Sequence, residues 1–183
     1  MDRNLLVLSG PSGIGKTHLV NILSAHGFIP VVMTTTRKPR VGEKQGVDYE
    51  FLSHKDYTRG IAETNDFFMD NHFLGNHYGI RRSAVRSVWD RCLIPVLVIY
   101  MTVIDQVVNE FPCAKKVFLY PSSLDIIKER LSLRDGNMKR LADVENELRL
   151  INLSHYRRYY DAIIKVDGDN VLPVITAILD LFN

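Results

Sequence analysis

The sequence has few cysteines, little net charge and no long apolar run. Its two cysteines, Cys92 and Cys113, lie far apart and outside any CxxC pattern. This is typical of reduced thiols in a cytosolic protein rather than of a disulfide framework. The formal net charge is only +2, which argues against a dedicated binder of nucleic acid or of anionic membranes.

The apolar stretch near the N-terminus, LLVLSG, is too short for a signal-peptide core or a membrane span. The chain also has no internal repeat, low-complexity tract or obvious linker. Its 183 residues, of which 46% are hydrophobic, suffice for one sizeable core and are few for two domains. We therefore expect a single soluble, cytoplasmic domain over residues 1–183, with no nucleic-acid or membrane partner.

Short apolar segments alternate along the chain with segments of helical periodicity. This alternation predicts an α/β fold with a parallel sheet flanked by helices, in which ligands bind at the carboxyl ends of the strands. The segment 29–35, IPVVMTT, is expected to be one extended stretch, and residues 139–160 one long helix. The other expected strands are 5–10, 48–53, 77–80, 95–101, 114–120 and 162–167, and the other main helices are 16–24, 83–92, 102–111, 122–133 and 172–182.

A phosphate-binding loop follows the first apolar strand. It matches G-x-x-x-x-G-K-[ST] at every position, through Gly10, Pro11, Ser12, Gly13, Ile14, Gly15, Lys16 and Thr17. Small residues let successive backbone N–H groups point at the phosphates, and the helix N-terminus adds its positive end. Lys16 supplies a mobile charge, and the Thr17 hydroxyl is the expected Mg²⁺ ligand. The loop predicts binding of a nucleoside triphosphate with Mg²⁺ but does not by itself identify a kinase.

A basic segment comes about twenty residues later. Arg37 and Arg40 flank a proline and form a stiff cationic bend. Guanidinium groups make forked hydrogen bonds to phosphate oxygens, which lysine does not reproduce. Tyr49 and Tyr78 each offer one hydroxyl donor, and Tyr78 lies in the glycine-flanked GNHYG. The segment suits a second phosphate, although a basic loop of this kind is also compatible with a merely solvated surface.

The order of these pieces resembles the guanylate kinase family. GPSGIGKTHL, TTTRKPRVGEKQGVDYEFLS, GNHYGIRRSAV and FPCAKKVFLYPSSLDIIKERL follow one another as in that family, and the resemblance covers nearly the whole chain. It implies a P-loop kinase with three parts. These are a core over 1–32 and 83–183, an insertion that binds the nucleoside monophosphate (NMP) at about 33–82, and a short lid at about 132–142.

The resemblance also implies substrates and site residues. ATP with Mg²⁺ would be the phosphate donor, and GMP or dGMP the acceptor, in a monomer or homodimer. Arg37, Arg40, Tyr49 and Tyr78 would bind the phosphate of the acceptor. The residues expected to act on the transferring phosphoryl group are Lys16, Arg37 and the two lid arginines, Arg134 and Arg140.

The sequence departs from the family where the acceptor base should bind. Residues that carry carboxylates or hydroxyls in the family are replaced here by Met33, Met69, Ile80, Val98 and Tyr100. Guanine donors buried without acceptors would cost about 1–3 kcal/mol each. The pocket is therefore expected to accept a modified or non-guanine nucleotide, unless a one-residue slip lets Asp70 restore the carboxylate.

Two of these replacements, Val98 and Tyr100, stand where the family's strand carries two carboxylates. One of those carboxylates would help to hold Mg²⁺ in related phosphate-loop enzymes. Asp48 or Asp70 could substitute for them. Two other functions stay open: a kinase for a sugar phosphate such as ribose bisphosphate, and a non-catalytic guanylate-kinase-like binding module. The complete basic segment argues against the first of these, and the intact phosphate loop argues against the second.

Overall fold

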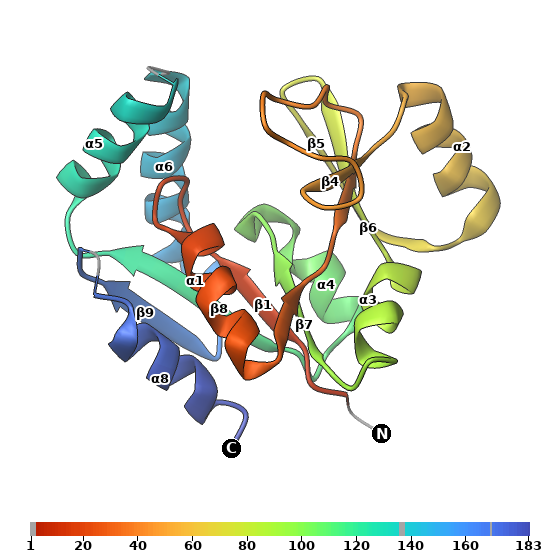
Figure 1. Cartoon of the computed structure of the whole chain (residues 1–183). Coiled ribbons are helices and arrows are strands. Elements are labelled where there is room, and N and C mark those ends of the chain that lie inside the picture. The colour runs from red at the N-terminus through yellow and green to blue at the C-terminus, as the bar shows by residue number, and fades with distance from the viewer. Residues whose placement is uncertain (1–2, 136–137, 169) are drawn as a thin grey trace.

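The computed structural model describes residues 3–135, 138–168 and 170–183, with the backbone alone for the ends of two helices within 133–140. A five-stranded parallel sheet forms the core, in the order β2-β7-β1-β8-β9. Its strands are β1 Leu6–Ser9, β2 Phe28–Pro30, β7 Ile94–Val98, β8 Lys115–Pro121 and β9 Ala162–Val166. The prediction of a parallel sheet flanked by helices is confirmed (Figure 1).

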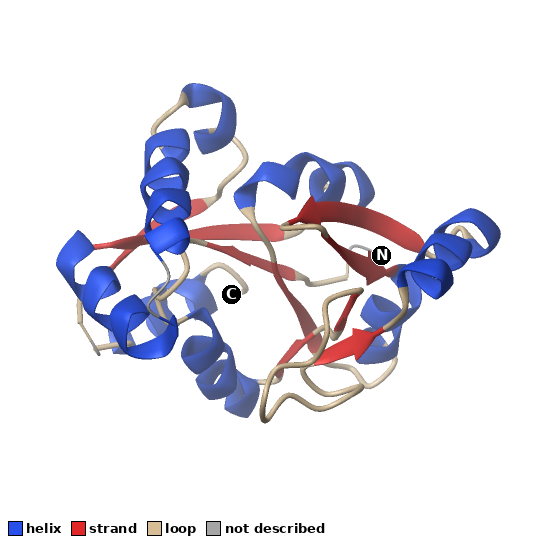
Figure 2. Cartoon of the chain, turned by 90° about the horizontal axis from the view of Figure 1, so that it is seen from above, coloured by secondary structure: helices blue, strands red, loops and turns tan. Residues whose placement is uncertain are grey.

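The first strand shows how the sequence builds two apolar layers. Side chains alternate between the faces of a strand, so Leu6 and Leu8 pack on one side, whereas Leu5 and Val7 pack on the other. The first side is covered by α1 Lys16–Leu23, α5 Leu124–Asp135, α6 Met138–Ile151 and α8 Leu172–Asp180, and the second by α3 Arg82–Trp89 and α4 Ile104–Glu110. Helices therefore lie on both sides of the strands (Figure 2).

The second sheet is smaller and mixed. Its order is β4-β3-β6-β5, with β3 parallel to β4 and antiparallel to β6. The elements are β3 Met33–Thr35, β4 Tyr49–Phe51, β5 Phe67–Phe73 and β6 Asn76–Arg81, and α2 His54–Thr64 packs against β5. Leu74 and Gly75 both have positive φ, as the two-residue turn of a tight hairpin requires. Gly79 is needed because a Cβ there would lie 2.3 Å from the Tyr57 hydroxyl oxygen.

Two expected elements are interrupted in the structure. The stretch 29–35 is not one strand, because β2 pairs with β7 in the core sheet whereas β3 pairs with β4 and β6 in the second sheet. The long helix expected over 139–160 ends at Ile151, and α7 Ser154–Arg157 follows separately. The Asn152 side-chain amide donates to the Leu148 carbonyl oxygen at 2.9 Å, and such a side-chain bond replaces the backbone bond that would continue a helix.

Short 3-10 turns complete the description, at Ser24–His26 and Met101–Val103. In the described part of the chain, no helix is both long enough and apolar enough to cross a bilayer.

Candidate active site

The phosphate loop connects β1 to α1 and curls around a lysine. The Lys16 Nζ donates to the carbonyl oxygens of Gly10 and Pro11 at 2.5 and 3.0 Å. Gly10 has a φ of 144°, and a Cβ there would come 2.7 Å from the Leu119 carbonyl oxygen of β8. Gly15 also has a positive φ, so the turn depends on glycine at both positions. The tight turn therefore places the lysine charge where the strand ends and the helix begins.

Lys16 is half-buried. Burial lowers the pKa of its ammonium group, and the nearby Glu147 carboxylate acts in the opposite direction. Thr17 and His18, which follow it, are exposed. The charge of Lys16 is thus held at the base of the loop, and the Thr17 hydroxyl is open to the cleft.

The expected phosphate clamp is assembled around Glu43. The Arg37 guanidinium makes a fork with this carboxylate, with both N–O distances at 2.9 Å. The same carboxylate accepts the Arg40 backbone N–H at 2.7 Å. Hydrogen bonding to Glu43 raises the pKa of Arg37 and, reciprocally, lowers the pKa of Glu43. One acid therefore fixes both the orientation of Arg37 and the bend of the loop that carries Arg40.

Aromatic rings support the clamp. The Arg37 guanidinium carbon lies 5.4 Å from the centre of the Tyr49 ring, and the Tyr49 and Tyr78 ring centres are 6.2 Å apart. Burial raises the pKa of Tyr49, so its hydroxyl remains a proton donor. The structure thus brings together Arg37, Tyr49 and Tyr78 from three segments of the insertion.

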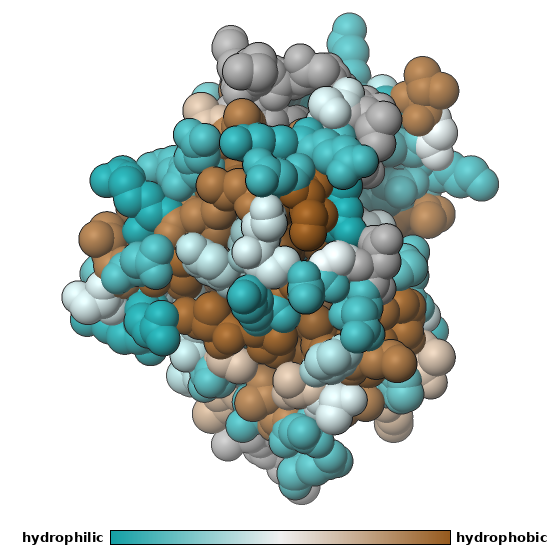
Figure 3. Space-filling view, turned by 90° about the vertical axis from the view of Figure 1, so that its left-hand side faces the viewer, coloured by the Kyte–Doolittle hydropathy of each residue, from teal (hydrophilic) through white to brown (hydrophobic). Residues whose placement is uncertain are grey.

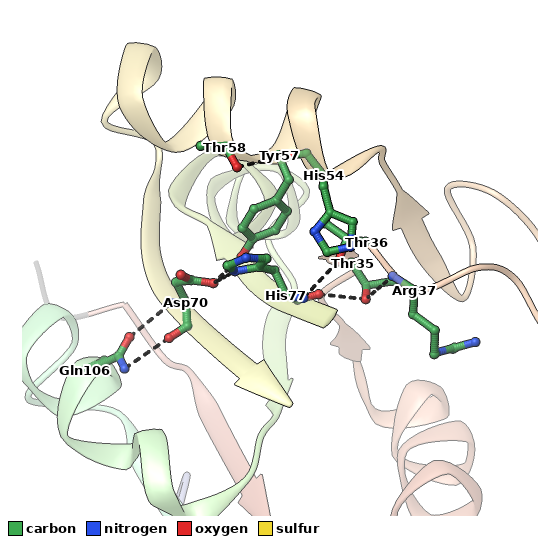
Figure 4. Close-up of polar contacts among 9 residues, drawn as sticks. All are labelled: Thr35, Thr36, Arg37, His54, Tyr57, Thr58, Asp70, His77 and Gln106. Atoms are coloured by element: carbon green, nitrogen blue, oxygen red, sulfur yellow. Dashed lines mark hydrogen bonds and ion pairs between the residues drawn. The ribbon is translucent and has the colours of Figure 1, made fainter. Parts of the chain in front are cut away.

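Asp70 lies outside this clamp. Its carboxylate accepts the Tyr57 hydroxyl at 2.7 Å and pairs with the His77 Nδ1 at 3.2 Å. Figure 4 shows these groups together, with the Arg37 side chain pointing away from them. Successive side chains of a strand point to opposite faces, so the neighbouring Met69 lines the cleft whereas Asp70 does not. The structure thus differs from the expectation that Asp70 replaces the missing acceptor carboxylate, and Asp70 instead stabilises the insertion.

The far end of the cleft is mostly apolar. Met33, Met69, Val98 and Tyr100 line it as expected, together with Asn71 and Phe73. Ile80 is fully buried in the second apolar layer and does not line the cleft. Asn71 also offers an amide group to the cleft. Sequence reasoning does not single it out, because it belongs to no recognisable motif.

These features share one continuous cleft of about 1010 Å³, lined by the phosphate loop, the Arg37 clamp and the apolar end. A separate hollow of about 420 Å³ lies between the start of α5 and α6. The side of the molecule that carries these helices is a mosaic of hydrophilic and apolar residues (Figure 3). Of these two cavities in the described part of the chain, the larger is the one lined by both the glycine-rich loop and Arg37.

The side chains of the two expected lid arginines, Arg134 and Arg140, lie outside the described residues. Arg130, one turn before Arg134 on α5, is described and lines the cleft. It donates to the carbonyl oxygens of Gly13 and Gly168, both at 3.3 Å. Arg130 therefore ties α5 to the phosphate loop, a role that helical spacing from Arg134 might have suggested but that no motif in the sequence marks.

Glu147 of α6 is the unexpected acid of the cleft. Its exposed fraction is 7%, and its Oε1 has no hydrogen-bond partner within the described structure. Burial raises the pKa of this carboxyl group from its ordinary value of 4.5 to about 7, although Lys16 and a backbone bond from Met101 act against the shift. The acids expected to compensate for Val98 and Tyr100 did not include Glu147.

The raised pKa of Glu147 predicts a loss of stability with increasing pH. The unfolded chain releases this proton near pH 4.5 and the folded protein only near pH 7, so ionisation favours the unfolded state. The free energy of unfolding should fall by about 3 kcal/mol across this window, at about 1.4 kcal/mol per pKa unit. Urea unfolding between about pH 5 and pH 8 should show this fall relative to Glu147→Gln. Parallel curves for the two proteins would contradict it.

The chain is similar to guanylate kinases in sequence and in fold. The guanylate kinase family model matches residues 2–179. A guanylate kinase of Alkalilimnicola ehrlichii is 34% identical over 180 residues, which cover 97% of this chain and 88% of the relative. One from Gloeobacter violaceus is 40% identical over 153 residues, covering 80% of this chain and 74% of the relative. The crystal structure of guanylate kinase from Anaplasma phagocytophilum has a TM-score of 0.72 at 23% identity, covering 97% of this chain and 83% of that one.

Proposed function

Because this chain belongs to the guanylate kinase family, we propose that it transfers the γ-phosphate of ATP to a nucleoside monophosphate, with GMP or dGMP as the first acceptor. The observation that carries the proposal is the single cleft that joins the Lys16 loop to the Arg37 clamp. The curated relatives are named guanylate kinase, in agreement with the resemblance noted in the sequence. A cytoplasmic location, where ATP and nucleoside monophosphates are available, is part of the proposal.

The residues of the cleft suit phosphoryl transfer, which depends on positioning and charge neutralisation more than on covalent chemistry. Lys16 and the loop N–H groups would hold the donor phosphates. Arg37 and Arg40, with the Tyr49 and Tyr78 hydroxyls, would hold the acceptor phosphate in line with them. Arg134 and Arg140 complete the proposed set as lid arginines that close on the transferring group.

The exposed Thr17 hydroxyl fits a magnesium ion, because hard oxygen donors are its preferred ligands and nucleotide phosphates would supply others. When bound, Mg²⁺ would neutralise phosphate charge and orient the donor.

The apolar residues of the cleft bear on which base the acceptor nucleotide carries. Met69 is 2% exposed and lines the cleft at the position where the family carries an acid. A nucleotide with an altered base is therefore the second candidate acceptor. The complete clamp makes ribose bisphosphate a weaker candidate for the acceptor. The intact phosphate loop makes a non-catalytic binding module a weaker candidate for the function.

The first experiment measures ADP release from ATP·Mg²⁺ with a panel of ribo- and deoxyribonucleoside monophosphates, common and modified, and with ribose bisphosphate. We expect turnover of GMP or dGMP with a high KM. Met69→Gln, which places a carbonyl acceptor in the pocket, should lower the KM for GMP by about tenfold, because a satisfied guanine donor is worth about 1–3 kcal/mol.

The matched control is Met69→Leu, which keeps the pocket apolar at similar volume and should leave the KM for GMP nearly unchanged. Efficient turnover of another monophosphate with poor turnover of GMP would assign the altered acceptor. Absence of turnover across the panel would refute the kinase proposal.

A further inference from the structure

Three buried oxygens lie together behind the phosphate loop. They are the Ser9 Oγ at the end of β1, the Glu147 Oε1 on α6, and the Tyr160 Oη between α7 and β9. Ser9 is fully buried and Glu147 nearly so. Buried polar atoms are almost always paired. The Ser9 and Tyr160 hydroxyls pair with each other, so the unpaired Glu147 Oε1 is the atom that requires an explanation.

The three groups are neighbours. Burial is the main cause of the raised pKa of Tyr160. A hydrogen bond with the Ser9 side chain lowers that pKa and the Glu147 charge raises it, so both groups lie close to the Tyr160 hydroxyl. Ser9 directly precedes Gly10, whose carbonyl oxygen accepts a hydrogen bond from the Lys16 ammonium. The cluster therefore lies at the base of the loop that would hold the donor phosphates.

Glu147 is the charged member of this cluster. Its carboxylate interacts with the ammonium group of Lys16, which belongs to α1, and with the Asp143 carboxylate of its own helix. A hydrogen bond from the Met101 backbone N–H stabilises its charged form. Met101 follows the strand β7, which ends with Val98 and continues to Tyr100, and neither of these residues is an acid. A helix thus brings a carboxylate to the sheet edge at which the strand itself has none.

A stabilising role does not explain this cluster. A buried carboxylate with one unpaired oxygen opposes folding, and an apolar or amide side chain of similar volume would be better tolerated. Unfavourable buried groups that persist are concentrated at functional sites, where the surrounding structure holds them in place.

We propose that Glu147 is a positioning residue for phosphoryl transfer. Its carboxylate, backed by the hydroxyls of Ser9 and Tyr160, provides the counter-charge that keeps the Lys16 ammonium aligned in the phosphate loop. The proposal rests on the proposed kinase function. It predicts an effect on kcat rather than on nucleotide affinity, because Glu147 would orient Lys16 and would not itself bind phosphate.

Glu147→Gln tests this, because it keeps the shape and removes the charge. We expect kcat to fall at least about tenfold, as for other groups that act on transition-state charge. Affinity for a non-hydrolysable ATP analogue with Mg²⁺, measured by calorimetry, should change less than about threefold, and the Tm near neutral pH should rise. Glu147→Asp should recover part of kcat. The control is Glu145→Gln, which removes an exposed acid from the same helix outside the cleft.

The outcomes separate the two proposals. If the wild-type protein turns over a monophosphate and Glu147→Gln matches Glu145→Gln in kcat, the role of Glu147 is refuted while the kinase function stands. If Glu147→Gln lowers the Tm, Glu147 is a structural residue and the inference is also wrong. If the wild-type protein is inactive on every acceptor, the kinase proposal fails, and a role for Glu147 in transfer fails with it.

Discussion

Replacing Lys16 by methionine is expected to lower kcat by about a thousandfold, the upper end of the loss seen when one donor to developing charge is removed. The ammonium group lies at the base of the phosphate loop and donates to the Gly10 and Pro11 carbonyl oxygens. Methionine fills a similar volume without charge. The variant should fold, because burial already disfavours the charged lysine, as its lowered pKa shows.

Steady-state ADP release and thermal unfolding check this expectation together. Lys38→Met is the matched control, because Lys38 is exposed on the neighbouring basic segment and does not line the cleft. Its kcat should remain within about twofold of the wild-type value, as for most surface substitutions. Comparable activity in Lys16→Met and Lys38→Met would mean that the loop lysine does not act on the transferring phosphoryl group.

Much of this cleft follows from local sequence signals. The phosphate loop is contiguous, so its motif specifies both the residues and their geometry. The alternation of Leu5, Leu6, Val7 and Leu8 between two apolar layers could also be anticipated, because a strand between two helical layers buries both its faces. In the same way, Arg37 and Arg40 are close in sequence and share one carboxylate, Glu43.

Features that depend on distant segments could not be predicted in this way. Glu147 looks like one of several acids on a charged helix, and only tertiary packing buries it beside Lys16. Asp70 looked like a replacement for the missing acceptor acid, because its orientation depends on which face of β5 meets the cleft. The prediction of one helix over 139–160 was wrong for a local reason. The periodicity of apolar residues does not reveal that the Asn152 side chain donates a hydrogen bond to the preceding turn.

Replacing Arg37 by lysine should lower kcat/KM for the acceptor by about fiftyfold, since a charge-assisted hydrogen bond is worth about 1.5–3 kcal/mol. Lysine keeps the charge, but it cannot form the fork with Glu43 and also present planar donors to a phosphate. It would also lose the stacking of the guanidinium group over the Tyr49 ring. The KM for ATP should change little, because the phosphate loop is built from separate residues.

A second substitution separates orientation from charge at this position. Glu43→Gln leaves Arg37 intact but weakens the bond that orients it, so the loss in kcat/KM for the acceptor should be smaller than that of Arg37→Lys. Arg59→Lys is the control, because Arg59 pairs with Asp56 on the exposed face of α2 within the same insertion. An equal loss for Arg37→Lys and Arg59→Lys would contradict a specific clamp. A normal Arg37→Lys enzyme would show that charge alone suffices, and the forked geometry around Glu43 would then serve the loop rather than the acceptor.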